Sequence, residues 1–319
     1  MNVRRTLLTT LLSAALVGAA PAQTKTVRIV VSFTAGGPVD AVARALSEQL
    51  GKELGRTVVI DNKPGANGAI GAMEVLRAEA DGNTLWITSV GAAAINPALY
   101  DKLPYDMQRD FAPVSLVVNN VELLVVNPSD PAAGAAEFVA AAKKSATPVA
   151  MASTGVGSIP HLAIEQLADA TGTRLLHIPY KGAAPAITDL MGGQVAGFFG
   201  DIPGLIGHVK SGKLKALGIA SPARHPALPD VRTLEEQSIH GVDTINWYAF
   251  FVSAKTPPAV VAALNKAVRD ALNTPAVRDR LLQSGAEPAP STPQELALLL
   301  KQDTDKWARL IKAKNIKAE

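Results

Sequence analysis

The chain of 319 residues contains no cysteine. This absence excludes a disulfide framework, thiolate zinc sites, iron–sulfur clusters and cysteine nucleophiles. Aromatic residues make up only 4% of the chain, too few for recognition of stacked nucleic-acid bases. The chain also lacks a large excess of one charge, because it contains 31 Lys and Arg residues and 28 Asp and Glu residues. What is present, 48% apolar and 18% charged residues, is typical of a globular protein with enough length for two domains.

Residues 1–22 have the pattern of a secretory signal peptide. Arg4 and Arg5 precede an uncharged stretch over 7–20, which is shorter than a membrane span. Small residues predict cleavage after Ala22, with a retained membrane anchor as the alternative. Cleavage would remove two arginines and no acid, which leaves 29 basic and 28 acidic residues in 297. We therefore expect an exported, periplasmic protein of nearly neutral charge, with no attraction for nucleic acid.

Strand patterns alternate with helix patterns along most of the chain, which predicts an α/β class with mainly parallel sheets. Strands are expected over 27–33, 58–61, 84–89, 114–118, 122–126, 149–152, 175–179, 195–199, 216–220 and 246–252. Helices are expected over 38–54, 69–80, 132–144, 160–171, 257–273, 275–283 and 293–314. Thr292 and Glu295 predict a capping box at the start of the last helix.

Two Gly-rich loops, each between a strand and a helix, are candidate binding elements. The first contains Gly36 and Gly37, and the second runs over 153–158 with hydroxyl groups on Ser153, Thr154 and Ser158. Such loops lie beyond the carboxyl ends of strands, where α/β sheets bind ligands, and helix amino ends favour anions. As alternatives, the first loop is a tight turn that binds nothing, and Ser158 only caps its helix.

Other polar residues near these loops leave their roles open. His161 and Glu165 share a helix face, which indicates surface pairing or packing more than a metal site, since no third ligand is near. His161 is also a candidate polar group for the ligand. Asp40 and Asp201 follow expected strands, so each faces a cleft or caps a helix, and capping is the better interpretation for Asp201.

Catalytic chemistry finds little support. No G-x-S-x-G elbow and no H-E-x-x-H pattern occurs, and paired carboxylates cannot be located. We therefore assign no catalytic residue, no metal ligand and no cofactor. Trp247 and Tyr248 either line a cleft or pack between domains, and packing is the usual role of bulky aromatic side chains.

Eight segments occur in a characteristic order along the chain. They are FTAGGPVD at 33–40, NKPGANG at 62–68, DFAPV at 110–114, GVGS at 155–158 followed by HL at 161–162, HIPYKG at 177–182, DLMGGQV at 189–195, GKLKAL at 212–217 and LPDV at 228–231. Together they resemble the Bug family of periplasmic solute receptors, the substrate-binding component of tripartite tricarboxylate transporters. The resemblance covers essentially the whole mature chain.

The resemblance implies a two-lobed periplasmic binding protein of the Venus flytrap type, type II, with crossing hinge strands, which closes on a small carboxylate. The lobes are expected to be 25–120 with 248–319, and 121–247. Ligand contacts carried over by the resemblance come from both lobes: Thr34, Ala35, Gly36, Gly37, Asp40 and Ser89 in one, and Ser153, Thr154, Gly155, Ser158 and His161 in the other.

One segment departs from the family pattern. Many members have Met-Phe-Asp-Asn-Leu-Pro where this chain has FFGDIP at 198–203, so Gly200 replaces the usual Asp and the carboxylate stands at Asp201. A shift by one residue redirects a side chain completely, and Asp201 therefore stays only a candidate ligand contact.

From these observations we predict a monomeric solute-binding protein that is not an enzyme. It would carry a small organic acid to the membrane subunits of a tripartite tricarboxylate transporter. A ligand receptor that feeds a signalling system and a periplasmic hydrolase or lyase are the alternatives.

Overall fold

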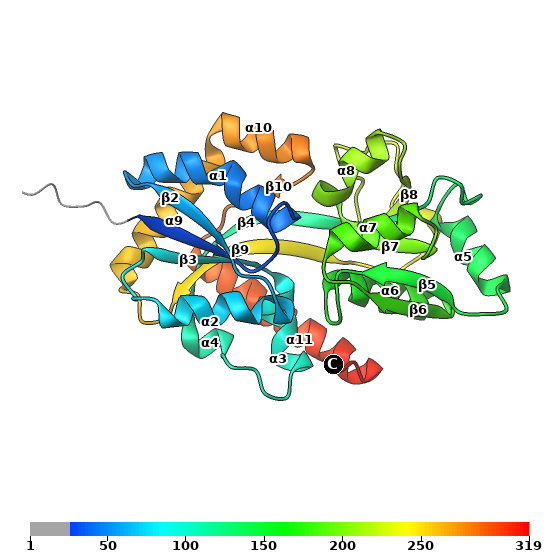
Figure 1. Cartoon of the computed structure of the whole chain (residues 1–319), viewed down its shortest axis with the longest axis horizontal. Coiled ribbons are helices and arrows are strands. Elements are labelled where there is room, and N and C mark those ends of the chain that lie inside the picture. Colours follow the sequence, from blue (N-terminus) through cyan, green and yellow to red (C-terminus); the bar gives the residue numbers. More distant parts are fainter. Residues whose placement is uncertain (1–25, 319) are drawn as a thin grey trace, which may run out of the picture.

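The structure, a computed structural model, describes residues 26–318, and the predicted signal peptide lies outside them. Two sets of parallel strands are joined by long antiparallel strands (Figure 1). The strands are β1 Val27–Val31, β2 Val58–Asn62, β3 Thr84–Ser89, β4 Phe111–Val126, β5 Val149–Ser153, β6 Leu175–Pro179, β7 Gly197–Asp201, β8 Lys215–Ile219, β9 Ile245–Ser253 and β10 Glu287–Pro288. The predicted α/β class is confirmed.

Helices connect the strands and cover the sheet. They are α1 Pro38–Leu54, η1 Ala66–Gly68, α2 Ala69–Arg77, η2 Gly91–Ile95, α3 Asn96–Leu99, α4 Met107–Asp110, α5 Ala135–Lys144, α6 Ile159–Thr171, α7 Ala183–Met191, α8 Ile202–Lys210, η3 Glu235–Gln237, α9 Pro258–Asn273, α10 Pro275–Ser284 and α11 Pro293–Lys314. The predicted capping box is present, because the Glu295 N–H donates to the Thr292 hydroxyl and the Thr292 N–H donates to the Glu295 carboxylate. Within residues 26–318, no helix is long and apolar enough to span a membrane.

The strand order is β2-β1-β3-β9-β4-β7-β5-β6. We call β1, β2 and β3 the first set and β5, β6 and β7 the second set, and within each set the strands are parallel. Strands β4 and β9 run antiparallel between the two sets, and β8 and β10 pair with β4. The first set lies on the left of Figure 1 and the second on the right, with β4 and β9 passing from one to the other.

The sequence predicted two strands over 114–118 and 122–126, whereas the structure has the single strand β4. The two asparagines between them favour a turn by propensity. Here they stay in the ladder because β9 pairs with β4 through Asn119 and Asn120, and the Asn120 side chain donates to the Asn246 carbonyl at 3.2 Å. Strand β7 also begins two residues later than expected, so Asp201 is the last strand residue and lies opposite Glu122.

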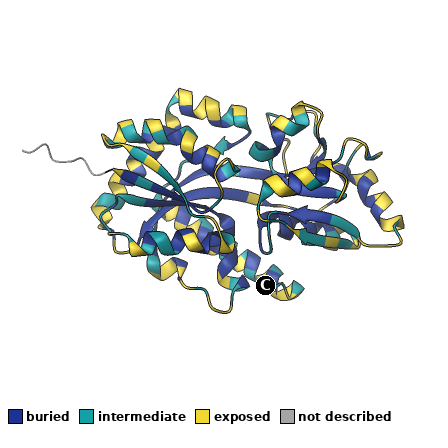
Figure 2. Ribbon diagram, viewed as in Figure 1, coloured by how far each residue is buried: buried dark blue, intermediate teal, exposed yellow. Residues whose placement is uncertain are grey.

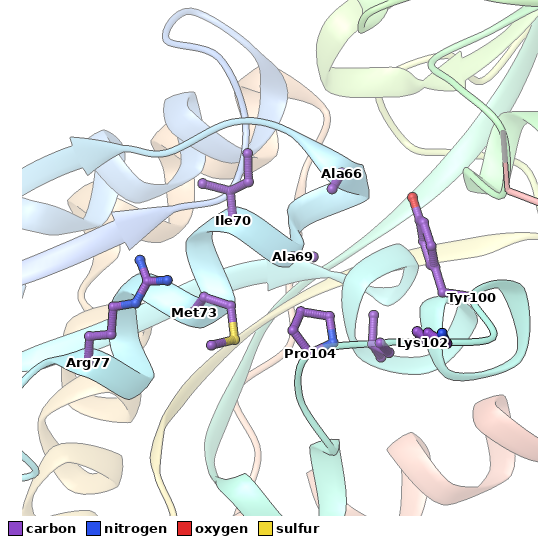
Figure 3. Close-up of a pocket in the computed structure, with 9 residues that line it drawn as sticks. Ala66, Ala69, Ile70, Met73, Arg77, Tyr100, Lys102 and Pro104 are labelled. Atoms are coloured by element: carbon purple, nitrogen blue, oxygen red, sulfur yellow. The ribbon is translucent and has the colours of Figure 1, made fainter.

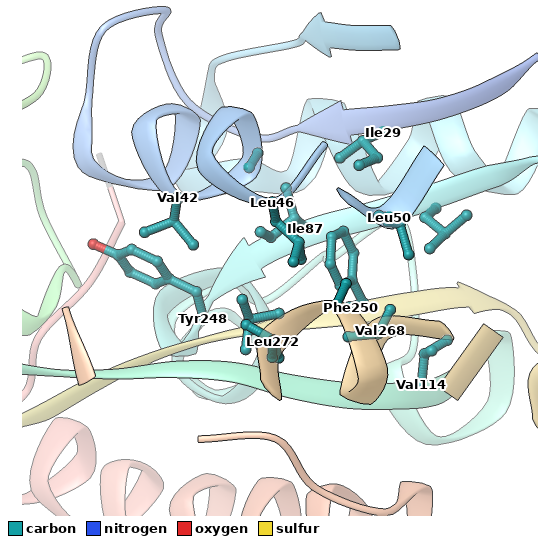
Figure 4. Packing of buried hydrophobic residues seen from close by; sticks show 14 of the residues in the cluster. Ile29, Val42, Leu46, Leu50, Ile87, Val114, Tyr248, Phe250, Val268 and Leu272 are labelled. Atoms are coloured by element: carbon teal, nitrogen blue, oxygen red, sulfur yellow. The ribbon is translucent and has the colours of Figure 1, made fainter. Parts of the chain in front are cut away.

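Apolar side chains form clusters on both faces of each set, and the central strands are buried almost throughout, while the outer strands β2 and β6 are half-buried or exposed (Figure 2). One cluster joins α1 and α9 to the first set and β9, with Tyr248 at its edge (Figure 4). Another contains Leu99 of α3 together with Ile159 and Leu162 of α6, so its apolar packing extends from the first set to the second.

Candidate functional site

The carboxyl edges of the two sets face each other. The Asn67 amide donates to the carbonyl of Gly157 at 3.5 Å, which connects η1 to the loop before α6. A Cβ atom placed on Gly157 would lie 2.2 Å from Leu99, and one on Gly204 would lie 3.2 Å from Pro38. The amino ends of α1 and α8 therefore meet, as do η1 and the amino end of α6. Both Gly-rich loops lie at this junction.

Asp40 shapes the first loop from inside. Its side chain is buried, and its Oδ2 accepts hydrogen bonds from the Gly36 N–H at 2.9 Å and from Arg44 at 2.8 Å. Its Oδ1 accepts from the Asn62 amide at 2.9 Å. Burial opposes ionisation, but these donors outweigh it and lower the pKa of Asp40. The carboxylate is thus anionic and fully used in holding Gly36, whose φ of +80° requires glycine.

The tip of the first loop is open to solvent. Thr34, Ala35 and Gly36 are exposed, while Gly37 is half-buried and occupies the N-cap of α1 without a side-chain cap. The first backbone N–H groups of a helix have no intrahelical partner, so they point outward here. Ser89, at the end of β3, is 7% exposed, and its hydroxyl has no hydrogen-bond partner among the described residues.

The second loop is held by its own hydroxyl groups. The Ser153 Oγ lies 2.5 Å from His177 Nε2 and accepts from the Gly155 N–H at 3.1 Å. The Ser158 hydroxyl donates to the Gly155 carbonyl at 2.7 Å and caps α6 by accepting from the His161 N–H at 3.4 Å. The capping alternative for Ser158 is therefore what the structure shows. Thr154 is half-buried, and its hydroxyl has no partner within residues 26–318.

His161 and His177 support this loop as neutral rings. The rings stack with centroids 3.6 Å apart and an interplanar angle of 10°. Burial lowers the pKa of His161 to about 3, with a further contribution from His177, and burial lowers the pKa of His177 to about 4. The Gly157 N–H donates to His161 Nδ1 at 3.1 Å, which assigns the ring hydrogen to Nε2. Among residues 26–318 no three metal-ligating side chains cluster.

Asp201 stands at the N-cap position of α8, but its side chain caps nothing. The capping interpretation is wrong because β9 offers better donors to the carboxylate. The Asn246 amide donates to both oxygens, at 3.0 and 3.1 Å, and the Tyr248 hydroxyl donates to Oδ2. Glu122 of β4 faces Asp201 across the ladder and is completely buried.

Sequence analysis missed these partners of Asp201. Glu122 offered a signal, because it is a lone acid inside the apolar run of β4. No local pattern indicates a contact of His177 with His161, because that contact depends on the pairing of β5 with β6. Trp247 and Tyr248 are both buried, in agreement with the packing interpretation.

The junction can hold an anion without a cationic side chain. The amino ends of α1 and α8 meet there, and the amino end of α6 lies against η1 and α3. Each amino end presents partly positive N–H groups, which favour an anion. The free hydroxyls of Ser89 and Thr154 add side-chain donors. A carboxylate is the group best matched to such a set of neutral donors.

A separate pocket lies between α2 and the chain over 100–104 (Figure 3). Its volume is about 360 Å³, and none of the predicted ligand contacts lines it. Its lining is mostly apolar, with basic groups on Arg77 and Lys102.

The chain is similar to known proteins over most of its length. The family model described as "Tripartite tricarboxylate transporter family receptor" matches residues 42–316. The chain is 33% identical to the protein BugT of Bordetella pertussis, over 90% of this chain and 88% of BugT. MatC from Rhodopseudomonas palustris, solved with malate, is 32% identical with a TM-score of 0.83, over 90% of this chain and 98% of MatC. An R. palustris protein solved with adipate is 30% identical with a TM-score of 0.88, over 92% of this chain and 98% of that one. These likenesses confirm the expected fold of a periplasmic binding protein.

Proposed function

Because the chain belongs to the tripartite tricarboxylate transporter receptor family, we propose that its ligand is a small organic carboxylate held at the junction of the two Gly-rich loops. As a member of that family the chain is a solute receptor for a transporter. The observation that carries the ligand class is that the amino ends of α1 and α8 meet, with the amino end of α6 against η1, beside free hydroxyl groups and with no cation required. The malate and adipate of the two related structures are acids of this kind.

We propose that residues 25–120 with 248–319 form one lobe and residues 121–247 the other. This division places the first set in lobe one and the second set in lobe two. It cuts the chain inside β4 and β9, the two strands that lie between the first set and the second set in the sheet. Ligand binding would shift an open–closed equilibrium by the difference in affinity between the two states.

The predicted ligand residues divide into two roles in this proposal. Thr34, Ala35, Gly36, Gly37, Ser89, Thr154 and Gly155 contact the ligand with backbone N–H and hydroxyl groups. The remaining five, Asp40, Ser153, Ser158, His161 and Asp201, hold those groups in position, because their polar atoms are already paired within the protein. The first role fits the exposure of the loop tips, and the second fits the burial of the side chains.

A catalytic role has one structural argument in its favour, the Ser153 Oγ at 2.5 Å from His177 Nε2. A nucleophile and its base stand at this distance in hydrolases. Ser153 is completely buried, however, so a substrate carbonyl cannot reach its oxygen. We therefore propose a binding protein without catalytic activity, exported to the periplasm as a monomer after loss of residues 1–22. Its partners would be the membrane subunits of a tripartite tricarboxylate transporter.

The test is a thermal-shift screen of the mature protein against malate, adipate, citrate and benzoate, with sugars and amino acids as controls. An acid present at about 100 times its Kd should stabilise the protein by about 2.7 kcal/mol. The proposal fails if sugars or amino acids raise the melting temperature and no acid does. Proton NMR of the acid after incubation separates binding from turnover, since a binding protein returns the acid unchanged.

A signalling role would use the same ligand site. Cross-linking of the acid-bound protein in its native membrane, followed by identification of the captured protein, distinguishes the two. Capture of transporter subunits supports the proposal, whereas capture of a sensor kinase contradicts it.

A further inference from the structure

Two carboxyl groups meet where the strands cross. Glu122 of β4 and Asp201 of β7 are paired positions in the antiparallel ladder, so their side chains lie on the same face. The paired register places the two carboxyl groups beside each other. Glu122 is completely buried, and among the described residues neither of its oxygens accepts a hydrogen bond from a neighbouring donor. An ionised Glu122 would be an uncompensated buried charge.

The surroundings of the pair are rich in acceptors and poor in donors. Asn120 and Asn246 lie opposite each other in β4 and β9, and their side-chain oxygens are buried without a donor as well. The donors to Asp201 are the Asn246 amide and the Tyr248 hydroxyl. One hydrogen on Glu122 completes this network, because a protonated carboxyl group can donate to the Asp201 carboxylate.

No cation faces the pair from the elements packed around it. Strand β9 brings Tyr248, and the first turn of α8 brings backbone N–H groups but no charged side chain. Strand β10 brings Glu287, 3.4 Å from His225, but Glu287 lies opposite Asn119 and therefore on the other face of β4. Helix α1 packs on the Tyr248 ring and carries Asp40, which is already bonded to Arg44.

Protonation of the pair follows from burial. Burial, and after it the charge of Asp201, raises the pKa of Glu122 well above its ordinary value. Burial also raises the pKa of Asp201, although hydrogen bonds from Glu122, Tyr248 and Asn246 oppose it. Both shifts favour a proton on the pair, and Glu122, the more deeply buried of the two side chains, is the better carrier.

The position of the pair connects it to lobe movement. Glu122 and Asn246 lie at the proposed lobe boundaries in β4 and β9, and Asp201 ends β7 of lobe two at the amino end of α8. Tyr248 packs in the apolar cluster of lobe one, and Figure 4 shows its hydroxyl pointing away from that cluster. The Tyr248–Asp201 bond thus ties the end of β7 to the core of the opposite lobe.

We propose that a proton shared by Glu122 and Asp201 at the crossing strands stabilises the closed arrangement of the lobes and couples ligand affinity to pH. This inference rests on the proposed function, because closure is taken to accompany binding of a carboxylate. Loss of the proton leaves two negative charges side by side in a buried site. Their repulsion favours an arrangement in which the Asp201 carboxylate moves away from Glu122 towards water and gives up its bond to Tyr248 of the opposite lobe, which opposes closure.

The decisive experiment compares the wild type with Glu122→Gln, whose amide donates to Asp201 at every pH. We would measure Kd for malate and adipate by calorimetry from about pH 6 to about pH 9, where both acids are fully ionised. The closed state is expected to hold the shared proton more tightly than the open state. At pH values between the pKa values of the pair in these two states, wild-type affinity should fall by up to about tenfold for each unit of rising pH. Affinity of Glu122→Gln should stay constant. A constant wild-type Kd, or an equal fall in the variant, overturns the proposal.

A second measurement needs no ligand, so it separates this inference from the proposed function. Difference infrared spectra of the ligand-free protein should show the C=O band of a buried protonated carboxyl group at neutral pH. The band should disappear in Glu122→Gln and remain in Glu287→Gln, the matched control on the other face. Absence of the band from the wild type overturns the inference even if acids bind. Its presence, with no acid bound at any pH, supports the proton site and defeats the ligand class.

If Glu122→Gln does not fold, Tyr248→Phe replaces it. Removing the hydroxyl takes a donor from the Asp201 carboxylate, so the pair should hold its proton to higher pH. The fall in affinity should then move to higher pH than in the wild type. An unchanged midpoint contradicts the proposal.

Discussion

His161 and His177 lie face to face at 3.6 Å, and each ring is hydrogen-bonded to one end of the loop over 153–158. Ser153 contacts His177, and the Gly157 N–H donates to His161. Both rings must be neutral for this arrangement, since two stacked imidazolium rings would repel each other. The loop that presents Thr154 therefore depends on two buried bases.

Acid should destabilise the protein through these rings. Unfolded histidine titrates near pH 6.5, whereas His177 has a pKa of about 4 and His161 of about 3 in the folded state. Between these values the unfolded chain binds more protons, so stability falls with decreasing pH by about 1.4 kcal/mol per pH unit for each ring. Above about pH 6.5 the contribution is fully present.

The measurement is the free energy of unfolding by urea between about pH 4 and pH 6.5, for the wild type and His177→Gln. The difference between the two curves isolates His177, because the Glu122–Asp201 pair contributes equally to both. His208→Gln, on α8, is the control and should follow the wild type. Parallel curves for the wild type and His177→Gln would show that His177 is not held neutral.

Asp40→Ala should weaken ligand binding without removing a ligand contact. Three donors lose their acceptor, including the Gly36 N–H, so we expect about 2 kcal/mol of destabilisation. Without the Asp40 carboxylate the first Gly-rich loop is less ordered, and the cost of ordering it on ligand binding should raise Kd about tenfold. Calorimetry with adipate and urea unfolding measure the two effects. Glu48→Gln, which removes an exposed pair with Lys52 on the same helix, should cost less than about 0.5 kcal/mol and leave Kd unchanged.

Gly157 allows the loop before α6 to approach α3. Gly157→Ala places a methyl group 2.2 Å from Leu99 at a φ of +72°, which would block the proposed closure of the lobes and strain the backbone. Affinity should fall more than about tenfold, which corresponds to at least 1.4 kcal/mol. Leu99→Val shortens the opposing side chain and should recover part of that loss in the double variant. Small-angle scattering with adipate should show compaction in the wild type and not in Gly157→Ala. Strictly additive losses in the double-mutant cycle would mean that the two residues do not meet in the bound state.

The hydroxyl groups of Thr154 and Ser158 have different roles in the proposal: that of Thr154 contacts the ligand, and that of Ser158 caps α6. Thr154→Val keeps the shape and removes a hydroxyl that has no partner in the described structure, so stability should change by less than about 0.5 kcal/mol while Kd rises. Ser158→Ala removes the cap of α6 and should cost about 1 kcal/mol of stability. Urea unfolding measures the stability of both variants, and calorimetry measures their Kd. An unchanged Kd in Thr154→Val removes Thr154 from the proposed contacts.

The sequence by itself determined most of the longer elements and their order. Period-two and helical patterns, with proline at the start of α1, α6, α9, α10 and α11, indicated these elements because local sterics and capping act within a few residues. Helix α11, with its capping box, was predicted to its first and last residue. The Gly-rich loops were likewise predicted, because each separates a strand pattern from a helix pattern.

The tertiary structure decided which side chain does what inside the candidate site. Asp40 and Asp201 each carry a polar group that suits a ligand or a structural bond, and local sequence cannot choose between these roles. The choice was made by residues far along the chain: Asn62 for Asp40, and Asn246 with Tyr248 for Asp201. The single strand β4 was decided in the same way, since pairing with β9 outweighed the low strand propensity of two asparagines. Buried polar groups take the best partner that the fold brings to them, and only the completed sheet fixes which partner that is.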